Sequence, residues 1–209
     1  MTIACGNPCP GYFAPGTRLY TEEGGDIFKG PRNMDAAKRL LGESGYAGEP
    51  ITLMAPQDLA HLKVWGDVTV DLLKRLDMTV DLAAVDAGTQ AARRQQKSPP
   101  RQGGWQMFVT IYSGVDCADP TNRLLRANGN ESWNGWAHNP QIEAEIAAWY
   151  NATSLDEEKT VVRRLNRLAV DDVLYAPLGV MLRHRAWRKN VSGIVQAPVP
   201  LFWDVSKTA

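Results

Sequence analysis

The chain has 209 residues, and its 23 basic and 23 acidic side chains give a formal net charge of zero. This balance argues against a nucleic-acid-binding protein, which typically carries an excess of Lys and Arg, and against attraction to an anionic membrane surface. Hydrophobic residues make up 44% of the sequence and charged residues 22%, as is typical of a globular protein with a hydrophobic core. No apolar run reaches the ~20 residues of a membrane-spanning helix, so we expect no direct membrane span.

Six glycines and four prolines lie within residues 1–31. Such a density predicts coil and turns rather than a packed element. The first 20 residues lack the basic and continuously apolar regions of a signal peptide, so we expect no secretion signal in them. Cys5, Cys9 and Cys117 are too few, and odd in number, for a disulfide framework. A Cys5–Cys9 bridge would need an oxidising compartment; otherwise all three thiols are free.

Two helices and two strands are predicted in the next part of the chain. Asn33 is a candidate N-cap, followed by apolar residues at helical spacing and by Gly45 as a stop. Residues 51–55 form an apolar run typical of a strand, apolar positions from Asp58 to Leu76 recur at helical spacing, and Met78 to Leu82 alternate in polarity. A strand, a helix and a strand in this order indicate a βαβ unit with parallel strands.

The second half of the chain continues with both kinds of element. A helix is predicted over 87–97, and a strand buried on both faces over 105–112. Asn139 and Pro140 open a helix to Tyr150, a capping box at Ser154–Glu157 opens a long helix, and 175–182 is predicted as an apolar strand. The predicted fold class is therefore α/β, with one mixed sheet and flanking helices.

A cluster of chemically useful residues follows the predicted strand that ends at Tyr112. It contains Ser113, Gly114, Asp116 and Asp119. Ligands of open α/β sheets bind beyond the carboxyl ends of strands, and two carboxylates beside an aromatic ring form an acceptor for a cationic group. The alternative is a turn with Asx hydrogen bonds. We expect Asp119 to be the N-cap of a helix that starts at the following proline, and for Asp116 both interpretations remain open.

Two further groups of residues admit a functional and a structural interpretation. The pair Arg93–Arg94 could bind a carboxylate with planar guanidinium groups, or could form a solvated helix face. Three tryptophans could line a ligand cleft or pack in a core or interface: Trp133, Trp136 and Trp203. The histidines show no metal-binding spacing, the common catalytic motifs are absent, and no cofactor is expected.

Four stretches of the sequence resemble one protein family in order and spacing. They are Met34–Tyr46, which contains AKRLLGESGY, Asn134–Ile146 (NGWAHNPQIEAEI), Ser154–Lys159 (SLDEEK) and Ala169–Leu178 (AVDDVLYAPL). These motifs resemble the family 5 extracellular solute-binding proteins, which are the dipeptide-, oligopeptide- and nickel-type binding proteins of ABC importers. The resemblance covers residues 30–205 and implies one lobe of a two-lobed, type II periplasmic-binding-protein fold without enzymatic activity.

The resemblance also implies a domain organisation. Members of that family are longer than this chain and have two main lobes, so these residues would be the carboxyl-terminal lobe of a longer protein. Residues 1–31 would be an inter-lobe segment, 32–186 the solute-binding lobe, and 187–209 a tail that returns to the first lobe. The full-length protein would act in the periplasm or outside the cell, where it would bind a peptide or similar small solute and deliver it to ABC permease subunits.

The resemblance assigns roles in the cluster after the 105–112 strand. The family's peptide binders place an aspartate four residues before a proline to pair with the α-ammonium group of the ligand, and here that residue is Asp116. The family offers strand main chain to the ligand just before that aspartate, which corresponds to Tyr112 and Gly114. Ser113 stands where the family usually has Trp, so the side-chain pocket and the ligand class stay open, and the family also takes up sugars, metals and chelates.

Two rival hypotheses come from other classes of protein. A small self-contained hydrolase would use Asp116 or Asp119 as a general base together with a histidine, although the usual motifs are absent. A structural or oligomerising module would cover the Asp116 loop in a symmetric dimer.

Overall fold

The chain forms two compact units. The computed structural model describes residues 9–181, 185–197 and 199–208. One unit is the continuous stretch Pro31–Ile111, and the other combines the segment that ends at Gly30 with the segment that starts at Tyr112. We call them the continuous unit and the discontinuous unit and describe each by itself.

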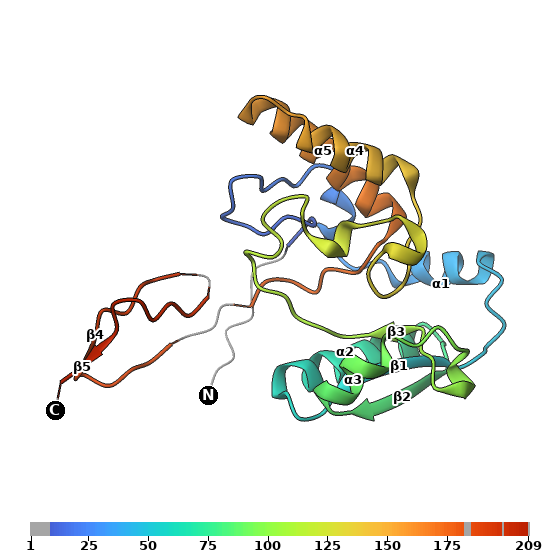
Figure 1. Cartoon of the computed structure of the whole chain (residues 1–209). Helices are drawn as coiled ribbons and strands as arrows, with labels where there is room; N and C mark the ends of the chain where they lie inside the picture. The colour runs from blue at the N-terminus through green and yellow to red at the C-terminus, as the bar shows by residue number, and fades with distance from the viewer. Residues whose placement is uncertain (1–8, 182–184, 198, 209) are drawn as a thin grey trace. The chain divides into compact units, whose positions relative to one another are not determined.

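The continuous unit is built on a three-stranded parallel sheet with strand order β2-β1-β3. Its elements in chain order are α1 (Met34–Glu43), β1 (Ile51–Pro56), α2 (Ala60–Arg75), β2 (Val80–Val85), α3 (Ala87–Arg93), the 3-10 helix η2 (Pro100–Gln102) and β3 (Met107–Phe108). The predicted βαβ unit is confirmed, because β1 and β2 pair in parallel and α2 connects them. Helices α2 and α3 lie beside the sheet (Figure 1).

The core of this unit lies where α2 packs on the sheet. Leu53 and Ala55 of β1, Leu62 of α2 and Val109 are all buried there. Gly66 allows the close approach, since a Cβ at this position would lie 2.5 Å from the Cβ of Ala55, which is too short for two carbon atoms.

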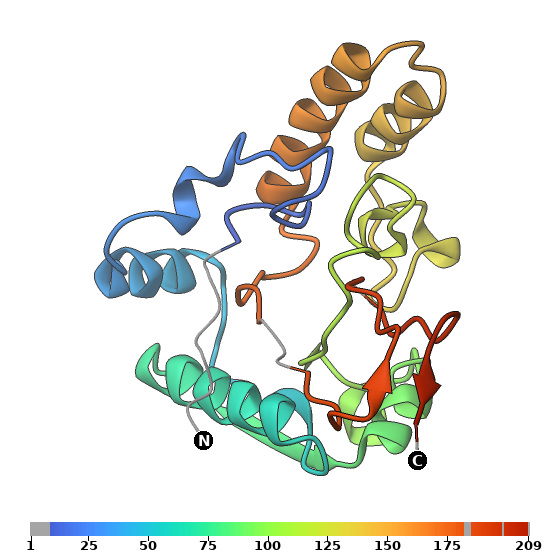
Figure 2. The same ribbon diagram turned by 90° about the vertical axis from the view of Figure 1, so that its left-hand side faces the viewer.

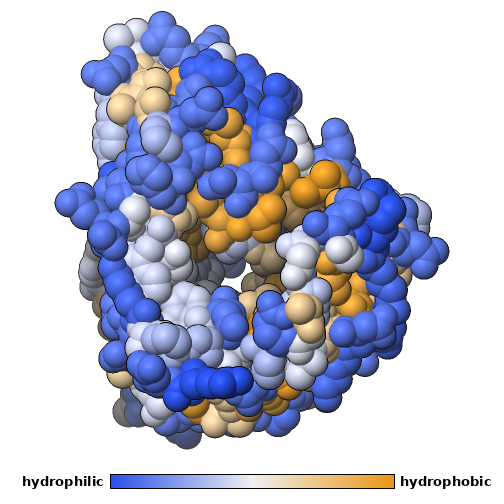
Figure 3. Space-filling model, turned by 90° about the vertical axis from the view of Figure 1, so that its right-hand side faces the viewer, coloured by the Kyte–Doolittle hydropathy of each residue, from blue (hydrophilic) through white to orange (hydrophobic). Residues whose placement is uncertain are grey.

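Three expectations for this unit need adjustment. The Asn33 side chain accepts a hydrogen bond from the Ala36 N–H and caps α1 as predicted, but α1 has no buried residue and Leu40 is 58% exposed. Figure 3 shows that hydrophobic residues gather in patches on a mostly hydrophilic face. Helix α3 ends at Arg93 instead of residue 97. The predicted strand over 105–112 is reduced to Met107–Phe108, which are half-buried because β3 is an edge strand of the sheet.

The discontinuous unit contains the helical pair α4 (Pro140–Tyr150) and α5 (Leu155–Asp172), which lie side by side (Figures 1 and 2). Both predicted starts are confirmed. The Asn139 side chain accepts from the N–H groups of Gln141 and Ile142, and the Ser154 hydroxyl accepts from the Glu157 N–H. The Glu157 carboxylate in turn accepts from the Thr153 N–H at 2.8 Å.

Shorter elements complete this unit. They are the 3-10 helices η1 (Gly25–Phe28), η3 (Arg123–Leu125) and η4 (Gly129–Glu131), and the strands β4 (Val191–Ser192) and β5 (Ser206–Lys207). Strands β4 and β5 pair antiparallel and form a separate sheet. The α/β class with flanking helices is confirmed, but the described strands form a parallel sheet and a separate antiparallel pair instead of the one mixed sheet that was predicted.

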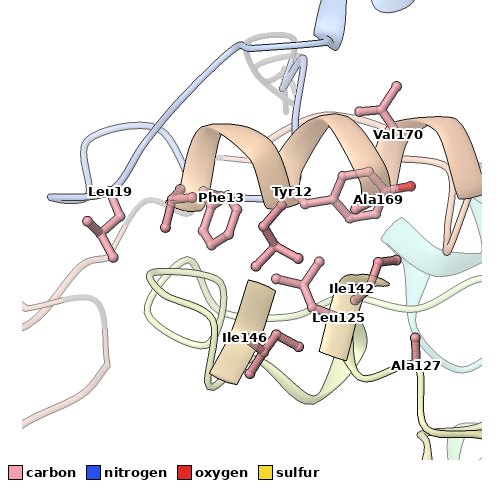
Figure 4. Packing of buried hydrophobic residues seen from close by; sticks show 11 residues of the cluster. Tyr12, Phe13, Leu19, Leu125, Ala127, Ile142, Ile146, Ala169 and Val170 are labelled. Atoms are coloured by element: carbon pink, nitrogen blue, oxygen red, sulfur yellow. The ribbon is translucent and has the colours of Figure 1, made fainter. Parts of the chain in front are cut away.

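The core of the discontinuous unit joins segments that are far apart in sequence (Figure 4). Ile142 and Ile146 come from α4, and Ala169 and Val170 come from α5. The glycine- and proline-rich start, predicted as coil, contributes Tyr12, Phe13 and Leu19, of which none is more than 1% exposed. This start is therefore irregular in conformation, as predicted, but its described part is an integral layer of the core.

Asn166 of α5 fixes this N-terminal segment. Its side chain is fully buried, accepts a hydrogen bond from the Tyr12 N–H at 2.8 Å and donates one to the Glu23 carbonyl at 2.7 Å. Because coil lacks internal hydrogen-bond partners, its buried main-chain groups need such side chains. Asn166 supplies both a donor and an acceptor to one segment.

The predicted strand over 175–182 is wrong for its described residues, which form no strand up to residue 181. The physical reason lies at Tyr175. The Tyr12 hydroxyl donates to the Tyr175 carbonyl at 2.6 Å and accepts from the Tyr175 N–H at 3.3 Å. A side chain therefore satisfies the main chain at the point where a neighbouring strand would otherwise pair.

Cys9 and Cys117 are free thiols, and Cys5 lies outside the described residues. Among the described helices, none combines the length and the apolar character needed to cross a membrane.

Candidate functional site

The predicted cluster forms a compact turn at residues 112–120, which we call the site loop. The Asp116 N–H donates to the Ser113 carbonyl at 3.0 Å, and the Cys117 N–H donates to the Gly114 carbonyl at 3.3 Å. The Asp116 carboxylate accepts from the Ser113 N–H at 3.2 Å. Asp116 therefore closes its own turn through one carboxylate oxygen while its side chain stays exposed to solvent, and this geometry fixes the position of the charge.

The N-terminal segment packs against the site loop at Ala14. The Ala14 N–H donates to the Cys117 carbonyl at 2.8 Å, and a Cβ on Gly114 would lie 3.5 Å from the Ala14 Cβ. Ala14 follows the core residues Tyr12 and Phe13 directly. The loop is thus anchored to the hydrophobic core through one short strip of main chain.

The main chain at the start of the site loop is open. Within the described residues, neither the N–H nor the C=O of Tyr112 makes a hydrogen bond, and the N–H of Gly114 has no partner either. Ser113 differs, because its N–H, C=O and hydroxyl all make hydrogen bonds inside the loop. An extended ligand could therefore pair with the main chain of Tyr112, whereas Ser113 holds the turn together.

The side chain of Tyr112 belongs to a stack of three residues. Its ring contacts the Trp133 ring edge to face, with ring centres 5.5 Å apart and planes at 84°. The guanidinium carbon of Arg123 lies 5.3 Å from the centre of the Tyr112 ring and 5.6 Å from that of Trp133. The Arg123 Nη2 also donates to the Tyr112 hydroxyl at 3.0 Å. We call these three residues the Arg123 stack.

A cavity of about 330 Å³ is lined in part by Trp133. Its walls carry both charged and aromatic side chains, and they are formed by Leu124, Arg126, Trp133, Asn134, Gly135, Ala137, His138, Asp172, Val173, Leu174 and Tyr175. Arg126 is neutralised by Glu143, with an Nη2–Oε2 distance of 2.7 Å. The cavity is large enough for a small side chain of a ligand, and Trp133 is shared between it and the Arg123 stack.

The groups buried near the loop stay uncharged at neutral pH. Burial, reinforced by the nearby charge of Asp116, raises the pKa of the Cys117 thiol to about 11. Burial likewise raises the pKa of Tyr12 to about 12 and shifts the pKa of Tyr175 upward. The charges at the surface of this region are therefore those of carboxylates such as Asp116 and of the Arg123 guanidinium.

The other candidate residues make local contacts of their own. Asp119 is not a helix N-cap, because Pro120 starts no helix; its carboxylate instead accepts from the Thr121 N–H at 2.8 Å in an Asx turn. Arg93 lies in the continuous unit, where it donates to the carbonyls of Gly103 and Gly104.

The tryptophans divide between different places. Trp133 lines the cavity, which is compatible with the interpretation of the tryptophans as cleft-lining residues. Trp136 occupies the same turn with a φ of 52°, where its N–H donates to the Trp133 carbonyl, but it is not among the cavity walls. Trp203 is 83% exposed. Arg123 was not predicted as a site residue, since nothing in the local sequence marks it.

The comparisons with known proteins agree with the resemblance seen in the sequence. No protein-family model matches the chain. A curated protein of Sinorhizobium fredii, named "Probable peptide ABC transporter periplasmic-binding protein", is 32% identical over 215 residues, which cover 99% of this chain and 40% of the relative. The chain therefore spans about two fifths of the length of this relative.

Solved structures share the fold. A dipeptide binding protein from Pseudoalteromonas sp. SM9913, in complex with Met-Leu, superposes with a TM-score of 0.67 at 13% identity and covers 97% of this chain and 40% of that one. The ABC transporter substrate binding protein CtaP from Listeria monocytogenes gives a TM-score of 0.61 at 14% identity, covering 81% and 33%. These relatives are solute-binding proteins and not enzymes. The chain is thus similar over nearly its whole length to part of a protein named as a peptide ABC transporter periplasmic-binding protein, and it shares its fold with part of solved substrate-binding proteins.

Proposed function

We propose that this chain is a ligand-binding part of the solute-binding component of an ABC importer, and that Asp116 binds the ammonium group of a peptide or similar small solute. The observation that carries the proposal is the geometry of the site loop. The Asp116 carboxylate is exposed and held in place by the Ser113 N–H, next to the unpaired main chain of Tyr112.

The chemistry of this arrangement suits the amino end of a peptide. A charge-assisted hydrogen bond contributes about 1.5–3 kcal/mol, and the exposure of Asp116 favours the lower end of that range. The free N–H and C=O of Tyr112 would pair with the extended main chain of the ligand, as an added strand does. The carboxylate would select for the ammonium group and the main chain for the peptide backbone.

The cellular location, the permease partners and the domain organisation belong to the same proposal. The intact protein would work in the periplasm or outside the cell and deliver its ligand to permease subunits. The domain assignment stays a prediction: an inter-lobe segment at residues 1–31, the solute-binding lobe at 32–186 and a returning tail at 187–209. Within the described residues, no histidine makes a hydrogen bond with Asp116 or Asp119. The described residues therefore show no Asp–His pair of the kind that the rival hydrolase hypothesis requires.

Calorimetry on the intact gene product that contains this chain tests the proposal. We expect a panel of di- and tripeptides to bind the wild type, and Asp116→Asn to lower their affinity about tenfold or more, because Asn keeps the hydrogen bond from Ser113 but removes the charge. Asp119→Asn is the matched control, since it removes an equal charge from the same loop. N-acetylated peptides should bind the wild type and Asp116→Asn alike.

Equal affinity of free peptides for wild type and Asp116→Asn would contradict the role of Asp116. Absence of peptide binding to the wild type would contradict the choice of ligand class.

A further inference from the structure

Two Asn–Gly pairs lie between Ala127 and Asn139, and their hydrogen bonds differ. They are Asn128–Gly129 and Asn134–Gly135. Asparagine is a chemically labile residue, and it loses its amide most readily before glycine, which has no Cβ to hinder attack by its own main-chain nitrogen on the preceding side chain. Whether a given pair reacts depends on the hydrogen bonds that hold the attacking nitrogen and the amide.

The Asn128–Gly129 pair is held at both reacting groups. The Gly129 N–H donates to the Ala137 carbonyl at 2.8 Å. The Asn128 side chain accepts from the Ser132 hydroxyl at 3.0 Å and donates to the Glu131 carboxylate at 3.3 Å. These bonds must break before the Gly129 nitrogen can attack, so the folded structure protects the Asn128 amide.

The Asn134–Gly135 pair occupies the centre of a tight turn. The Trp136 N–H closes this turn by donating to the Trp133 carbonyl at 2.9 Å, so the two central residues take no part in the closing bond. Within the described residues, the Gly135 N–H makes no hydrogen bond. Gly135 is exposed, and apart from its neighbours in the chain nothing lies within 4 Å of the position that a Cβ would take. The attacking nitrogen at this pair is therefore neither bonded nor shielded.

We propose that Asn134 is a site of covalent modification, at which the side-chain amide is hydrolysed without an enzyme. The Gly135 nitrogen gives up its proton to solvent and bonds to the side-chain carbonyl carbon of Asn134. The bond from that carbon to the amide nitrogen breaks, and the nitrogen takes up a proton and leaves as ammonia. Water then opens the resulting cyclic imide at either carbonyl carbon, which yields Asp or isoaspartate. The net reaction consumes one water and releases one ammonia, with no oxidation or reduction.

The modification changes the cavity that Trp133 lines. Asn134 belongs to the wall of this cavity, as do Arg126 and Asp172. Because Arg126 is already paired with Glu143 at 2.7 Å, the new carboxylate makes the wall more acidic. The modified cavity therefore favours cationic groups over anionic ones. This inference does not rest on the proposed function, since it concerns the chemistry of the turn itself.

Prolonged incubation of the intact gene product in mildly alkaline buffer tests the proposal. Digestion after glutamate separates the two pairs, since Glu131 lies between them, and tandem mass spectrometry then measures the loss of amide at each. We expect Asn134 to convert to Asp and isoaspartate at least about tenfold faster than Asn128, because the hydrogen bonds at the Asn128–Gly129 pair must break first. In concentrated urea both pairs should react at comparable rates, because unfolding removes the structural difference.

Variants connect the reaction to one residue. Asn134→Gln should remove the acidic species that accumulates on isoelectric focusing, because the longer side chain closes a ring more slowly. Asn128→Gln is the matched control and should leave that species unchanged. Asn134→Asp should focus at the acidic position before any incubation.

Two results would overturn the inference. If Asn128 reacts as fast as Asn134 in the folded protein, the hydrogen bonds of the loop do not decide which amide is lost. If Asn134 stays intact in the folded protein while it reacts in urea, the turn protects this amide instead of exposing it.

Discussion

Replacing Asn166 by Leu tests whether one buried side chain holds the N-terminal segment in the core. Leu has the same branching as Asn but bulkier methyl groups in place of the amide, so the change removes both hydrogen bonds and leaves no cavity. It deprives the Tyr12 N–H and the Glu23 carbonyl of their partners, which lie at 2.8 and 2.7 Å in wild type. We expect the variant to fold with reduced stability.

The magnitude follows from the surroundings of the two orphaned groups. A buried donor or acceptor left without a partner costs about 1–3 kcal/mol. The Tyr12 N–H is fully enclosed, whereas Glu23 is half-buried, so water can partly satisfy its carbonyl. The expected loss in the free energy of unfolding is therefore about 2–4 kcal/mol, a large share of the 5–15 kcal/mol typical of a folded domain.

Urea-induced unfolding followed by circular dichroism measures this loss. The control is Arg167→Ala, one residue further along α5, which removes an exposed ion pair with Glu23 of the same segment and should cost less than about 1 kcal/mol. A loss for Asn166→Leu no larger than that of Arg167→Ala would refute the reasoning, because the buried hydrogen bonds would then contribute no more than a surface contact.

Two other predictions concern packing and pH. Gly66→Ala should destabilise the protein by about 1–3 kcal/mol in the same urea assay, because its Cβ would lie 2.5 Å from that of Ala55; Gly42→Ala in α1, where nothing lies within 4 Å, should instead be neutral or slightly stabilising, and equal effects would contradict the packing argument. The pKa of Cys117 is raised from 9.0 to about 11 in the folded chain, so the unfolded state loses the thiol proton at a lower pH than the folded state does. The contribution of the protonated Cys117 to the free energy of unfolding is therefore lost as the pH rises from 9 to 11. Thermal midpoints measured at pH 7, 9 and 11 should therefore fall less steeply in Cys117→Ala than in wild type, and parallel curves would contradict the shifted pKa.

Local sequence signals were sufficient for several helix starts and for one supersecondary unit. Asn33, Asn139 and Ser154 each cap a helix as predicted, since a cap and the first turn involve residues only two or three positions apart. The βαβ unit was predictable because its strands and crossover helix have distinct apolar periods. The prediction that Asp116 lies in a loop was also correct, although the strand before that loop is shorter than predicted.

What the sequence did not reveal depends on contacts between distant segments. The apolar run over 175–182 has the composition of a strand, but Tyr175 is paired with the Tyr12 hydroxyl, 163 residues away. The Arg123 stack joins residues that share no helix or strand, so no periodic pattern marks it. The local sequence around Asp119 was also insufficient, because the choice between a helix N-cap and an Asx turn depended on whether a helix follows.

The division of the chain into a continuous and a discontinuous unit has a consequence for the order of folding. During synthesis, residues 31–111 are complete early, and the continuous unit can fold while the rest of the chain is still being made. Tyr12 and Phe13, although synthesised before the continuous unit, acquire their packing partners on α5 only on the order of 10 s later, at typical rates of translation. The residues that support the site loop therefore wait for their packing partners, and during that interval their apolar side chains are open to aggregation or to capture by a chaperone.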